Sequence, residues 1–364
     1  MLGKQVSEKI PLFLRTIQRK TAHLQVGDRV DLLDLFQRCS MSAVCHILFG
    51  DSSGSPLVPY VDPNGRKHMI SLEESYMRVE TDCDAAFKTV LNQLFPFLLD
   101  NHLGPLNRRN HNNRLAFDAA LKQFLANSPQ DDTIYGRLIR EVNASEEDIL
   151  DDLKGLMFAG FDSTSRACTG TMYRLLKHPH YLEKLREQLQ DLAKKEKTLE
   201  ESFKMHIKDL DFLSYVCKEG LRIDPPAQGS IGYQVKKECK IAGVTMKKGW
   251  EINVAIHAVH RDPRHWQKPD EFLPERFDED SELYLTPEGK RRSPFAFLPF
   301  SYGSRSCAGQ NMAKTEMSVF VAYMVLFLEL ELDLDDYMKD YSDIAFSLGT
   351  PNRLHVRLLK DQRT

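Results

Sequence analysis

The segment from Phe300 to Gly309 (Phe-Ser-Tyr-Gly-Ser-Arg-Ser-Cys-Ala-Gly) carries more structural information than any other part of this 364-residue chain. Gly303 allows a tight turn, and Gly309 lets the backbone come close to a flat neighbouring group, because neither residue has a Cβ. An apolar run with helical spacing begins directly after Gly309. Cys307 is therefore predicted to lie at a helix N-terminus beside the cation of Arg305, where a thiol ionises readily.

The chemistry that such a cysteine offers is that of a soft, electron-rich ligand. A single thiolate on haem iron favours cleavage of an O–O bond. The alternative for a lone cysteine is a small buried hydrophobe. The coincidence of Phe300, Gly303, Arg305 and Gly309 with Cys307 favours a ligand. The other six cysteines never form a CxxC pair, so neither a zinc site nor a disulfide framework is expected, as in a reducing compartment.

Composition narrows the class of protein. Hydrophobic residues make up 42% of the chain and charged residues 28%, which is typical of a globular protein with a sizeable core. The net charge of −3 gives no reason to expect a nucleic-acid partner. No signal peptide or membrane span is visible, since the longest apolar stretch, residues 319–328, is about half a span and suits a buried core helix.

Hydrophobic periodicity predicts a mainly α-helical fold with a small β region, in a single domain over residues 1–364. Loops are expected at residues 51–68 and 262–300, where Gly, Pro and Asn gather. Strand-and-turn character is expected at 230–256 and in short strands at the C-terminus. Helices are predicted at residues 6–24, 30–49, 70–102, 112–126, 145–177, 179–195 and 208–223, and after Cys307.

The predicted helix 145–177 contains an unusual polar segment. It begins at a capping box on Ser145 and includes Phe-Ala-Gly-Phe-Asp-Ser-Thr-Ser at residues 158–165. Glycine inside a helix costs about 1 kcal/mol, and hydroxyl side chains compete for backbone carbonyls. A local bulge with a polar notch and an ordinary helix with an exposed polar patch are both open interpretations.

A second pattern is Glu219-Gly-Leu-Arg222, which places an acid and a base on one helix face. Taken alone it is an ordinary surface ion pair. Arg276, in Pro-Glu-Arg-Phe, can add a second guanidinium and make a buried, bidentate network with a structural role. The histidines at 178, 180, 257 and 260 lack a carboxylate at metal-site spacing, so we interpret them as surface or core groups.

Taken together, these segments occur in one order: Ala159 to Thr164, Glu219 to Arg222, Pro274 to Phe277, and then the Cys307 loop. This order resembles the cytochrome P450 family of haem-thiolate monooxygenases, of the eukaryotic microsomal type. The resemblance extends from about residue 25 to the C-terminus, and the run from His260 to Phe272 also matches the family's pattern.

The resemblance implies roles for individual residues. Cys307 is expected to be the axial ligand of haem b iron, with Arg305 on a haem propionate and Phe300 beside the sulfur, in the loop shaped by Gly303 and Gly309. The residues expected on the distal side, for lining and proton delivery, are Ala159, Gly160, Asp162, Ser163 and, as a substitute hydroxyl, Thr164. Glu219, Arg222 and Arg276 correspond to the structural triad. Substrate loops are expected at Ala227 to Ile231 and Phe346 to Thr350.

By the same resemblance, the protein is expected to insert one oxygen of O2 into a lipophilic substrate such as a fatty acid or sterol-like lipid. By this resemblance, electrons are expected to come from an NADPH-dependent reductase, at the cytosolic face of the endoplasmic reticulum membrane. The chain departs from the family pattern in having Ser163 where threonine is usual, no cation at 227–232, and no Trp-x-x-x-Arg segment. The expectation is an N-terminally truncated fold without the membrane anchor, cytosolic if this chain is the product.

Two other functions stay open at this point. The first is an inactive or unstable partial fold with impaired haem binding. The second is a haem-thiolate isomerase or dehydratase that uses peroxides, which is disfavoured because such proteins usually lack the Asp162–Ser163 notch.

Overall fold

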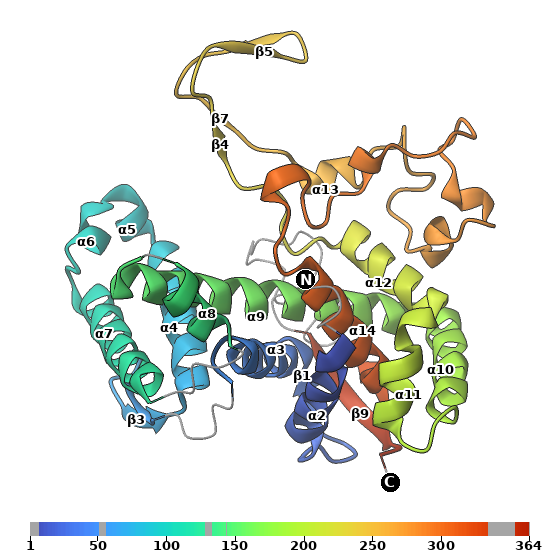
Figure 1. Cartoon of the computed structure of the whole chain (residues 1–364), viewed down its shortest axis with the longest axis horizontal. Coiled ribbons are helices and arrows are strands. Elements are labelled where there is room, and N and C mark those ends of the chain that lie inside the picture. Colours follow the sequence, from blue (N-terminus) through green and yellow to red (C-terminus); the bar gives the residue numbers. More distant parts are fainter. Residues whose placement is uncertain (1–6, 51–55, 128–132, 143, 334–353, 364) are drawn as a thin grey trace. The chain divides into compact units, whose positions relative to one another are not determined.

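The computed structural model describes residues 7–50, 56–127, 133–142, 144–333 and 354–363. The chain divides into two compact units. The first unit comprises residues 1–40 and 160–364, and the second comprises residues 41–159. Helices α3 (Leu32–Phe49) and α9 (Glu146–Lys177) each contribute residues to both units. The structure is mainly helical with small antiparallel sheets, which confirms the predicted fold class (Figure 1).

A three-stranded sheet in the first unit pairs strands from the N-terminal and C-terminal parts of the chain. Its strands are β1 (Arg29–Asp31), β9 (His355–Asp361) and β8 (Leu328–Leu332), antiparallel and in that order. Residues 30 and 31 were predicted to lie at the start of a helix and are instead strand, because they pair with residues 356 and 355. The carboxylate of Asp31 accepts hydrogen bonds from the backbone N–H groups of Leu33 and Asp34, so α3 begins only after it.

Helix α14 (Gln310–Phe327) is the core helix of the first unit. The Phe320 ring is fully buried, with its centroid 6.3 Å from the rings of Phe13 on α2 (Ile10–Thr21) and Phe36 on α3. The predicted core helix after Cys307 is confirmed. The other helices of this unit are α10 (Pro179–Ala193), α11 (Leu199–His206), α12 (Asp211–Ile223) and α13 (Ile256–Val259), and its 3-10 turns are η1 (Ser7–Lys9), η2 (Ile207–Asp209), η3 (Pro274–Phe277), η4 (Glu282–Tyr284), η5 (Pro294–Ala296) and η6 (Gly303–Arg305).

The second unit has a helical core built around the Tyr76 and Phe117 rings, whose centroids are 5.1 Å apart. Its own elements are β2 (Val58–Val61), β3 (Lys67–Ile70), α4 (Leu72–Phe87), α5 (Val90–Leu94), α6 (Phe97–Asp100), α7 (Pro105–Ala126) and α8 (Ile134–Glu141). Residues 56–68 were predicted to be loop, which is wrong for the β2–β3 hairpin. The amide of Asn113 on α7 holds this hairpin by exchanging hydrogen bonds of 3.0 and 2.9 Å with the backbone of Val61.

The region 70–102 was predicted to be helical throughout, but the structure breaks it into three helices. After α4, the side chains of Thr89 and Asn92 donate hydrogen bonds of 2.8 and 2.7 Å to the carbonyl of Ala86, which ends the helical ladder there. Pro96 then separates α5 from α6. These side-chain contacts have no periodic signature in the sequence.

Helix α9 matches its predicted bounds. Its capping box is present, because Ser145 Oγ accepts from the N–H of Asp148 at 3.1 Å and the Asp148 carboxylate accepts from the N–H of Ser145 at 3.3 Å. The alternative of a local bulge at residues 158–165 is wrong, since residues 146–177 are α-helical without a break. The hydroxyl-rich segment is accommodated by a regular helix.

Helix α3 is the one described helix that is long and apolar enough to cross a membrane. Within the structure, 72% of its apolar stretch is buried. Burial of this extent is typical of a core helix in a globular protein.

Residues 233–252 form what we call the arm. It consists of a β4–β7 pair (Tyr233–Gln234 and Glu251–Ile252) and a β5–β6 hairpin (Cys239–Ile241 and Val244–Met246), drawn as a narrow two-stranded ribbon in Figure 1. The strand character predicted for 230–256 is confirmed. Gly243 and Gly249 adopt positive φ angles of 82° and 90° in the two turns that the arm requires.

Candidate functional site

The loop before α14 has a defined backbone conformation. Gly303, with a φ of 77°, opens the turn η6, and the N–H of Cys307 donates a 2.9 Å hydrogen bond to the carbonyl of Phe300. Gly309 is the N-cap residue of α14, whose first residue is Gln310. The loop thus places Cys307 three residues before the positive end of the helix dipole, as predicted from the sequence.

The side chain of Cys307 is exposed, and its sulfur has no hydrogen-bond partner among the described residues. A Cβ added at Gly309 would lie 3.9 Å from the sulfur, so the glycine keeps this side of the thiol open. All seven cysteines are free, but four of them are buried: Cys39, Cys45, Cys168 and Cys217. Burial raises the pKa of Cys217 to about 12 and that of Cys168 well above its usual value, which keeps both as unreactive thiols.

The neighbours of Cys307 in the loop are placed as follows. Arg305 is exposed and has no carboxylate partner among the described residues. Phe300 is half-buried, and the ammonium group of Lys314 lies 5.4 Å from the centroid of its ring. An exposed thiol, an unneutralised guanidinium and two glycines on one loop fit a flat ligand that carries a metal ion and acidic groups. The residues present therefore fit a haem with propionates.

The predicted distal residues lie on α9 with different exposures. The Asp162 carboxylate accepts from Nε of Arg166 at 3.0 Å to each oxygen, so it is fixed along its own helix. Ala159 and Ser163 are exposed and Gly160 is half-buried. Thr164 is buried, with 4% of its surface exposed, so its hydroxyl does not share the surface to which Ser163 belongs.

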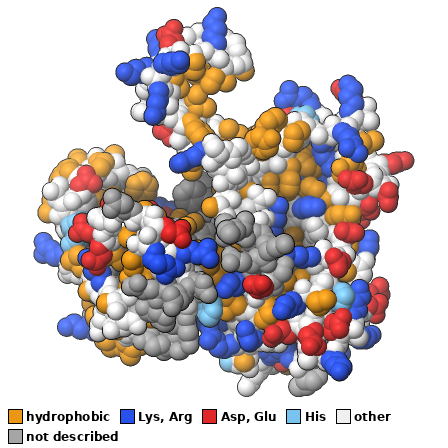
Figure 2. Space-filling model, viewed as in Figure 1, with side chains coloured by type: hydrophobic (Ala, Val, Ile, Leu, Met, Phe, Trp, Pro, Cys, Tyr) orange, Lys and Arg blue, Asp and Glu red, His pale blue; other side chains and the backbone are white. Residues whose placement is uncertain are grey.

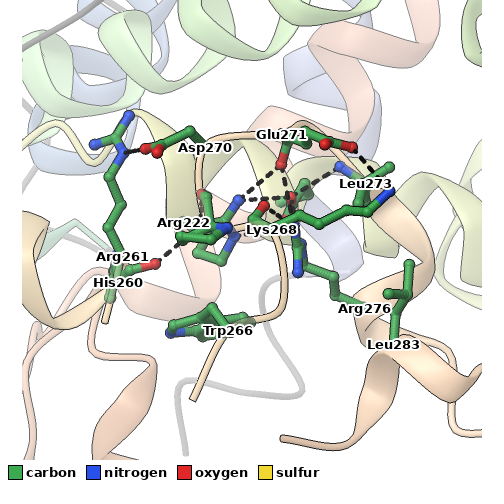
Figure 3. Close-up of polar contacts among 12 residues, drawn as sticks. Arg222, His260, Arg261, Trp266, Lys268, Asp270, Glu271, Leu273, Arg276 and Leu283 are labelled. Carbon is green, nitrogen blue, oxygen red and sulfur yellow. Dashed lines mark hydrogen bonds and ion pairs between the residues drawn. The ribbon is translucent and has the colours of Figure 1, made fainter. Parts of the chain in front are cut away.

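Glu219, Arg222 and Arg276 are brought together and are fully buried. Figure 3 shows the two arginines among their polar contacts. The guanidinium of Arg222 binds both oxygens of the Glu219 carboxylate, each at 2.8 Å, and Nε of Arg276 donates to one of them at 3.1 Å. The same oxygen accepts from the N–H of Leu273 at 2.9 Å. A buried charge pair is retained only when its remaining donors and acceptors are satisfied, and here they are.

The two arginines also bind the backbone of the segment that follows α13. Arg222 donates to the carbonyls of His260, Pro269 and Glu271 at 2.9, 2.7 and 3.0 Å. Arg276 donates to the carbonyls of Gln267 and Lys268. The network therefore fixes a long, otherwise irregular loop.

The sequence did not predict the position of His260. Its Nε2 accepts a 2.7 Å hydrogen bond from the N–H of Leu298, while its carbonyl accepts from Arg222. Burial, with Arg222 nearby, lowers the pKa of His260 to about 3, so the ring is neutral and Nδ1 carries the proton. The carbonyl of Leu298 accepts from the N–H of Ser301 at 3.1 Å. His260 thus links the charge network to the start of the Cys307 loop.

Glu316 is a second group that sequence reasoning missed. It is fully buried on α14, and neither carboxylate oxygen has a hydrogen-bond partner among the described residues. Burial raises the pKa of Glu316 to about 8, an effect that the nearby Ser40 hydroxyl only partly offsets. Nothing in the sequence indicated that Glu316 is buried, because isolated acidic residues are common on the exposed faces of helices.

Of the two predicted substrate loops, the structure describes only the one at residues 227–231. Ser230 donates its N–H to the carbonyl of Val254 at 3.0 Å, which holds residues 227–231 at the base of the arm. The segment from Phe346 to Thr350 lies outside the described residues.

Comparison with known proteins places the chain in a family. A sequence model described as cytochrome P450 matches residues 4–355. Cytochrome P450 4F3 of Rattus norvegicus is 35% identical over 182 residues, covering 50% of this chain and 33% of that protein. Berbamunine synthase of Berberis stolonifera is 28% identical over 316 residues, covering 83% of this chain and 59% of that protein.

The fold has a solved counterpart. The structure of cyanobacterial CYP120A1 with bound retinoic acid superposes with a TM-score of 0.73, at 20% identity, over 98% of this chain and 75% of that one. This similarity confirms the predicted fold. The chain spans about a third to three-fifths of the length of the two curated relatives named above.

Proposed function

The chain belongs to the cytochrome P450 family of haem-thiolate enzymes, and on this basis we propose that it binds haem b through Cys307 and inserts one oxygen of O2 into a lipophilic substrate. The observation that carries the proposal is the exposed sulfur of Cys307 three residues before α14, which has no hydrogen-bond partner in the part of the chain that the structure describes. Of the other six cysteines, four are buried, Cys83 is half-buried within helix α4, and Cys239 lies on the arm, away from any such loop.

Each residue of the loop has a distinct task in this proposal. Arg305 neutralises a propionate, because its guanidinium has no carboxylate partner among the described residues. Phe300 covers the sulfur from one side and fixes it through the bond between its carbonyl and the N–H of Cys307. Gly303 and Gly309 allow the macrocycle to lie against the backbone. Haem, when bound, supplies the activation of dioxygen and the oxidising equivalent.

On the distal side, Ala159 and Gly160 present little side-chain volume, which leaves room for a flat group and a substrate. We assign proton delivery to Oγ of exposed Ser163 and to the carboxylate of Asp162. Arg166 orients that carboxylate through the ion pair, so a proton passing through Asp162 requires this ion pair to loosen. Buried Thr164 is a less suitable donor than Ser163.

The proposal includes partners and location at the level of the family. A fatty acid or sterol-like substrate, an NADPH-dependent reductase and the cytosolic face of the endoplasmic reticulum membrane are what the family suggests. The chain covers a limited share of the relatives' length. The substrate, the reductase and the location therefore each need a test with this chain itself.

Haem titration of the purified chain tests the ligand assignment. Wild-type protein is expected to bind one equivalent of haem, whereas Cys307→Ala loses tight binding. Cys239→Ala, which removes the exposed thiol of the arm, is the matched control and binds as wild type does. A folded wild-type chain that takes up no haem would overturn the proposal in favour of an inactive partial fold.

Replacement of Ser163 by Ala tests the proton-delivery role. With reductase and NADPH, we expect haem binding to be unchanged and product formed per NADPH to fall, because Oγ of Ser163 would no longer supply protons to the haem site. Thr164→Ala serves as the control on the buried neighbour. If Ser163→Ala leaves the coupling unchanged, Ser163 is not the donor, and a peroxide-using isomerase or dehydratase gains support.

A further inference from the structure

A cavity of about 470 Å³ in the first unit is lined by α12, α14 and the loop that leads to Cys307; we call it the α12–α14 cavity. Helix α12 contributes Ser214 and Lys218 to its lining, and α14 contributes Lys314 and Ser318. Small-molecule sites have volumes of about 300–1,000 Å³, so the cavity can hold an organic ligand. Figure 2 shows hydrophobic side chains next to Lys and Arg side chains on the surface around α12 and α13, at the upper right of the view.

The charged residues that line the cavity are both lysines, and no acidic residue is among its described lining residues. Neither Lys218 nor Lys314 has a carboxylate partner in the described part of the chain. Their ammonium groups lie over aromatic rings instead, at 5.7 Å from the centroid of Tyr215 and 5.4 Å from that of Phe300. Burial, with Lys218 nearby, lowers the pKa of Lys314. Two neighbouring cations without a counter-ion are stabilised by a bound anion.

The rest of the cavity wall is mostly apolar. Leu221 and Met317 are 4% and 1% exposed, and Phe297 and Phe300 add aromatic rings. Apolar walls with a few polar groups are typical of sites for organic ligands. An inorganic anion would leave these walls in contact with water, whereas an anion that carries an apolar group would cover them.

The number of cations indicates which anion fits. A phosphate monoester has a charge of about −1.5 to −2 near pH 7, because its second pKa is about 6, and so it balances two ammonium groups. A carboxylate would balance only one of them. The hydroxyl of half-buried Ser214 makes no hydrogen bond with another described residue, so it offers a further donor to the phosphate. The concave lining suits a small ligand better than the broad surface of an acidic protein.

We propose that the α12–α14 cavity binds a phosphate monoester that carries an aromatic or aliphatic group. Lys218 and Lys314 hold the phosphate, and the apolar group lies against Leu221, Phe297 and Met317. This inference goes beyond the proposed oxidation and does not depend on it, because it concerns neither the iron ligand nor turnover.

The cavity adjoins the Cys307 loop without including the thiol. Phe300 and Ser306 are among its lining residues, whereas Cys307 is not. A ligand in the cavity therefore contacts the loop and leaves the sulfur accessible. We expect the site to bind its ligand both with and without haem.

Isothermal titration calorimetry of the full chain with 1-naphthyl phosphate tests the site. We expect one molecule to bind per chain. Inorganic phosphate, which lacks the apolar group, and 1-naphthol, which lacks the charge, are each expected to bind at least about tenfold more weakly. Affinity for 1-naphthyl phosphate should rise between about pH 5 and 7, as the phosphate takes its second charge, and should fall with salt.

Replacement of either lysine by Gln tests the assignment to this cavity. Lys218→Gln and Lys314→Gln are each expected to weaken binding of 1-naphthyl phosphate about tenfold or more, whereas Lys314→Arg keeps the charge and most of the affinity. Lys184→Gln is the matched control. Lys184 is also an exposed helix lysine whose ammonium group lies over a ring, at 4.1 Å from the centroid of Phe212, but it is outside the cavity.

Four results would overturn the proposal. Absence of 1-naphthyl phosphate binding at millimolar concentration would exclude the site, and equal affinities for 1-naphthyl phosphate and 1-naphthol would exclude recognition of the phosphate. Unchanged affinity in both Gln variants would place the ligand elsewhere. Loss of binding when haem is added would assign the ligand to the haem site. A chain that binds 1-naphthyl phosphate but takes up no haem would support this site and contradict only the proposed oxidation.

Discussion

Two buried ionisable residues, His260 and Glu316, show how single side chains carry information that pattern analysis does not. His260 was interpreted as a surface or core histidine, and the structure makes it the acceptor for Leu298 ahead of the Cys307 loop. Glu316 lies in a run that was read only as an apolar helix. In both cases the decisive property is burial, which depends on packing by residues distant in the sequence.

Replacement of Glu316 by Gln is expected to change how stability depends on pH. The unfolded chain loses this proton near pH 4.5, but the folded chain keeps it to about pH 8, so the wild-type free energy of unfolding falls as pH rises between these values. Denaturant titrations at several pH values should show that, between these two pH values, the free energy of unfolding of the variant rises relative to that of wild type by roughly 1 kcal/mol per pH unit. Exposed Glu187→Gln is the control, and parallel curves for Glu316→Gln and wild type would contradict the account.

Replacement of His260 by Ala leaves the buried N–H of Leu298 without its acceptor. We expect destabilisation of about 1–3 kcal/mol by thermal or denaturant unfolding at neutral pH. The unfolded chain protonates this histidine near pH 6.5 and the folded chain only near pH 3, so wild type loses stability as pH falls through this window. The His260→Ala variant has no histidine to protonate at this position, so it does not show this part of the acid-induced loss of stability. Exposed His23→Ala is the control, and an unchanged stability in His260→Ala would refute the link.

At the scale of elements, local signals predicted α9, α12 and α14, because each has its cap, periodicity or stop signal within its own sequence. The hairpin β2–β3 and the strand β1 escaped prediction. Strand β1 pairs with β9 from the other end of the chain, and β2 is held by Asn113 of α7. Such partners leave no trace in the four or fewer residues of each strand.

The network that joins α12 to η3 is expected to be essential for folding. Replacement of Glu219 by Ala leaves Arg222 and Arg276 buried without their counter-ion, which costs about 3–5 kcal/mol. The control is Glu288→Ala, which removes an ion pair with Lys290 whose side chains are 72% and 75% exposed and costs less than about 1 kcal/mol. The melting temperatures of the two variants test this expectation. Equal decreases would mean that the buried network stabilises the fold no more than an exposed ion pair does.

At the scale of the chain, the Phe300–Gly309 loop indicated the candidate site from sequence alone, because its glycines, cation and cysteine are contiguous. The link from this loop through His260 to Glu219 could not be predicted from the sequence. It joins three segments that are far apart in the chain: α12, the segment after α13 and the residues before η6. The family comparison over residues 4–355 agrees with the order of segments found in the sequence. The remaining question for the chain is whether Cys307 ligates iron.

The reduced carbon monoxide difference spectrum of the haem-loaded chain answers this question most directly. A thiolate ligand gives the strongly red-shifted Soret band that nitrogen ligands do not give, so we predict that band for wild type and for Cys239→Ala. Cys307→His, which offers a nitrogen ligand at the same position, should retain haem less tightly and lack the band. A wild-type spectrum with an unshifted Soret band, or a shifted band that persists in Cys307→His, would contradict the assignment of Cys307 as the iron ligand.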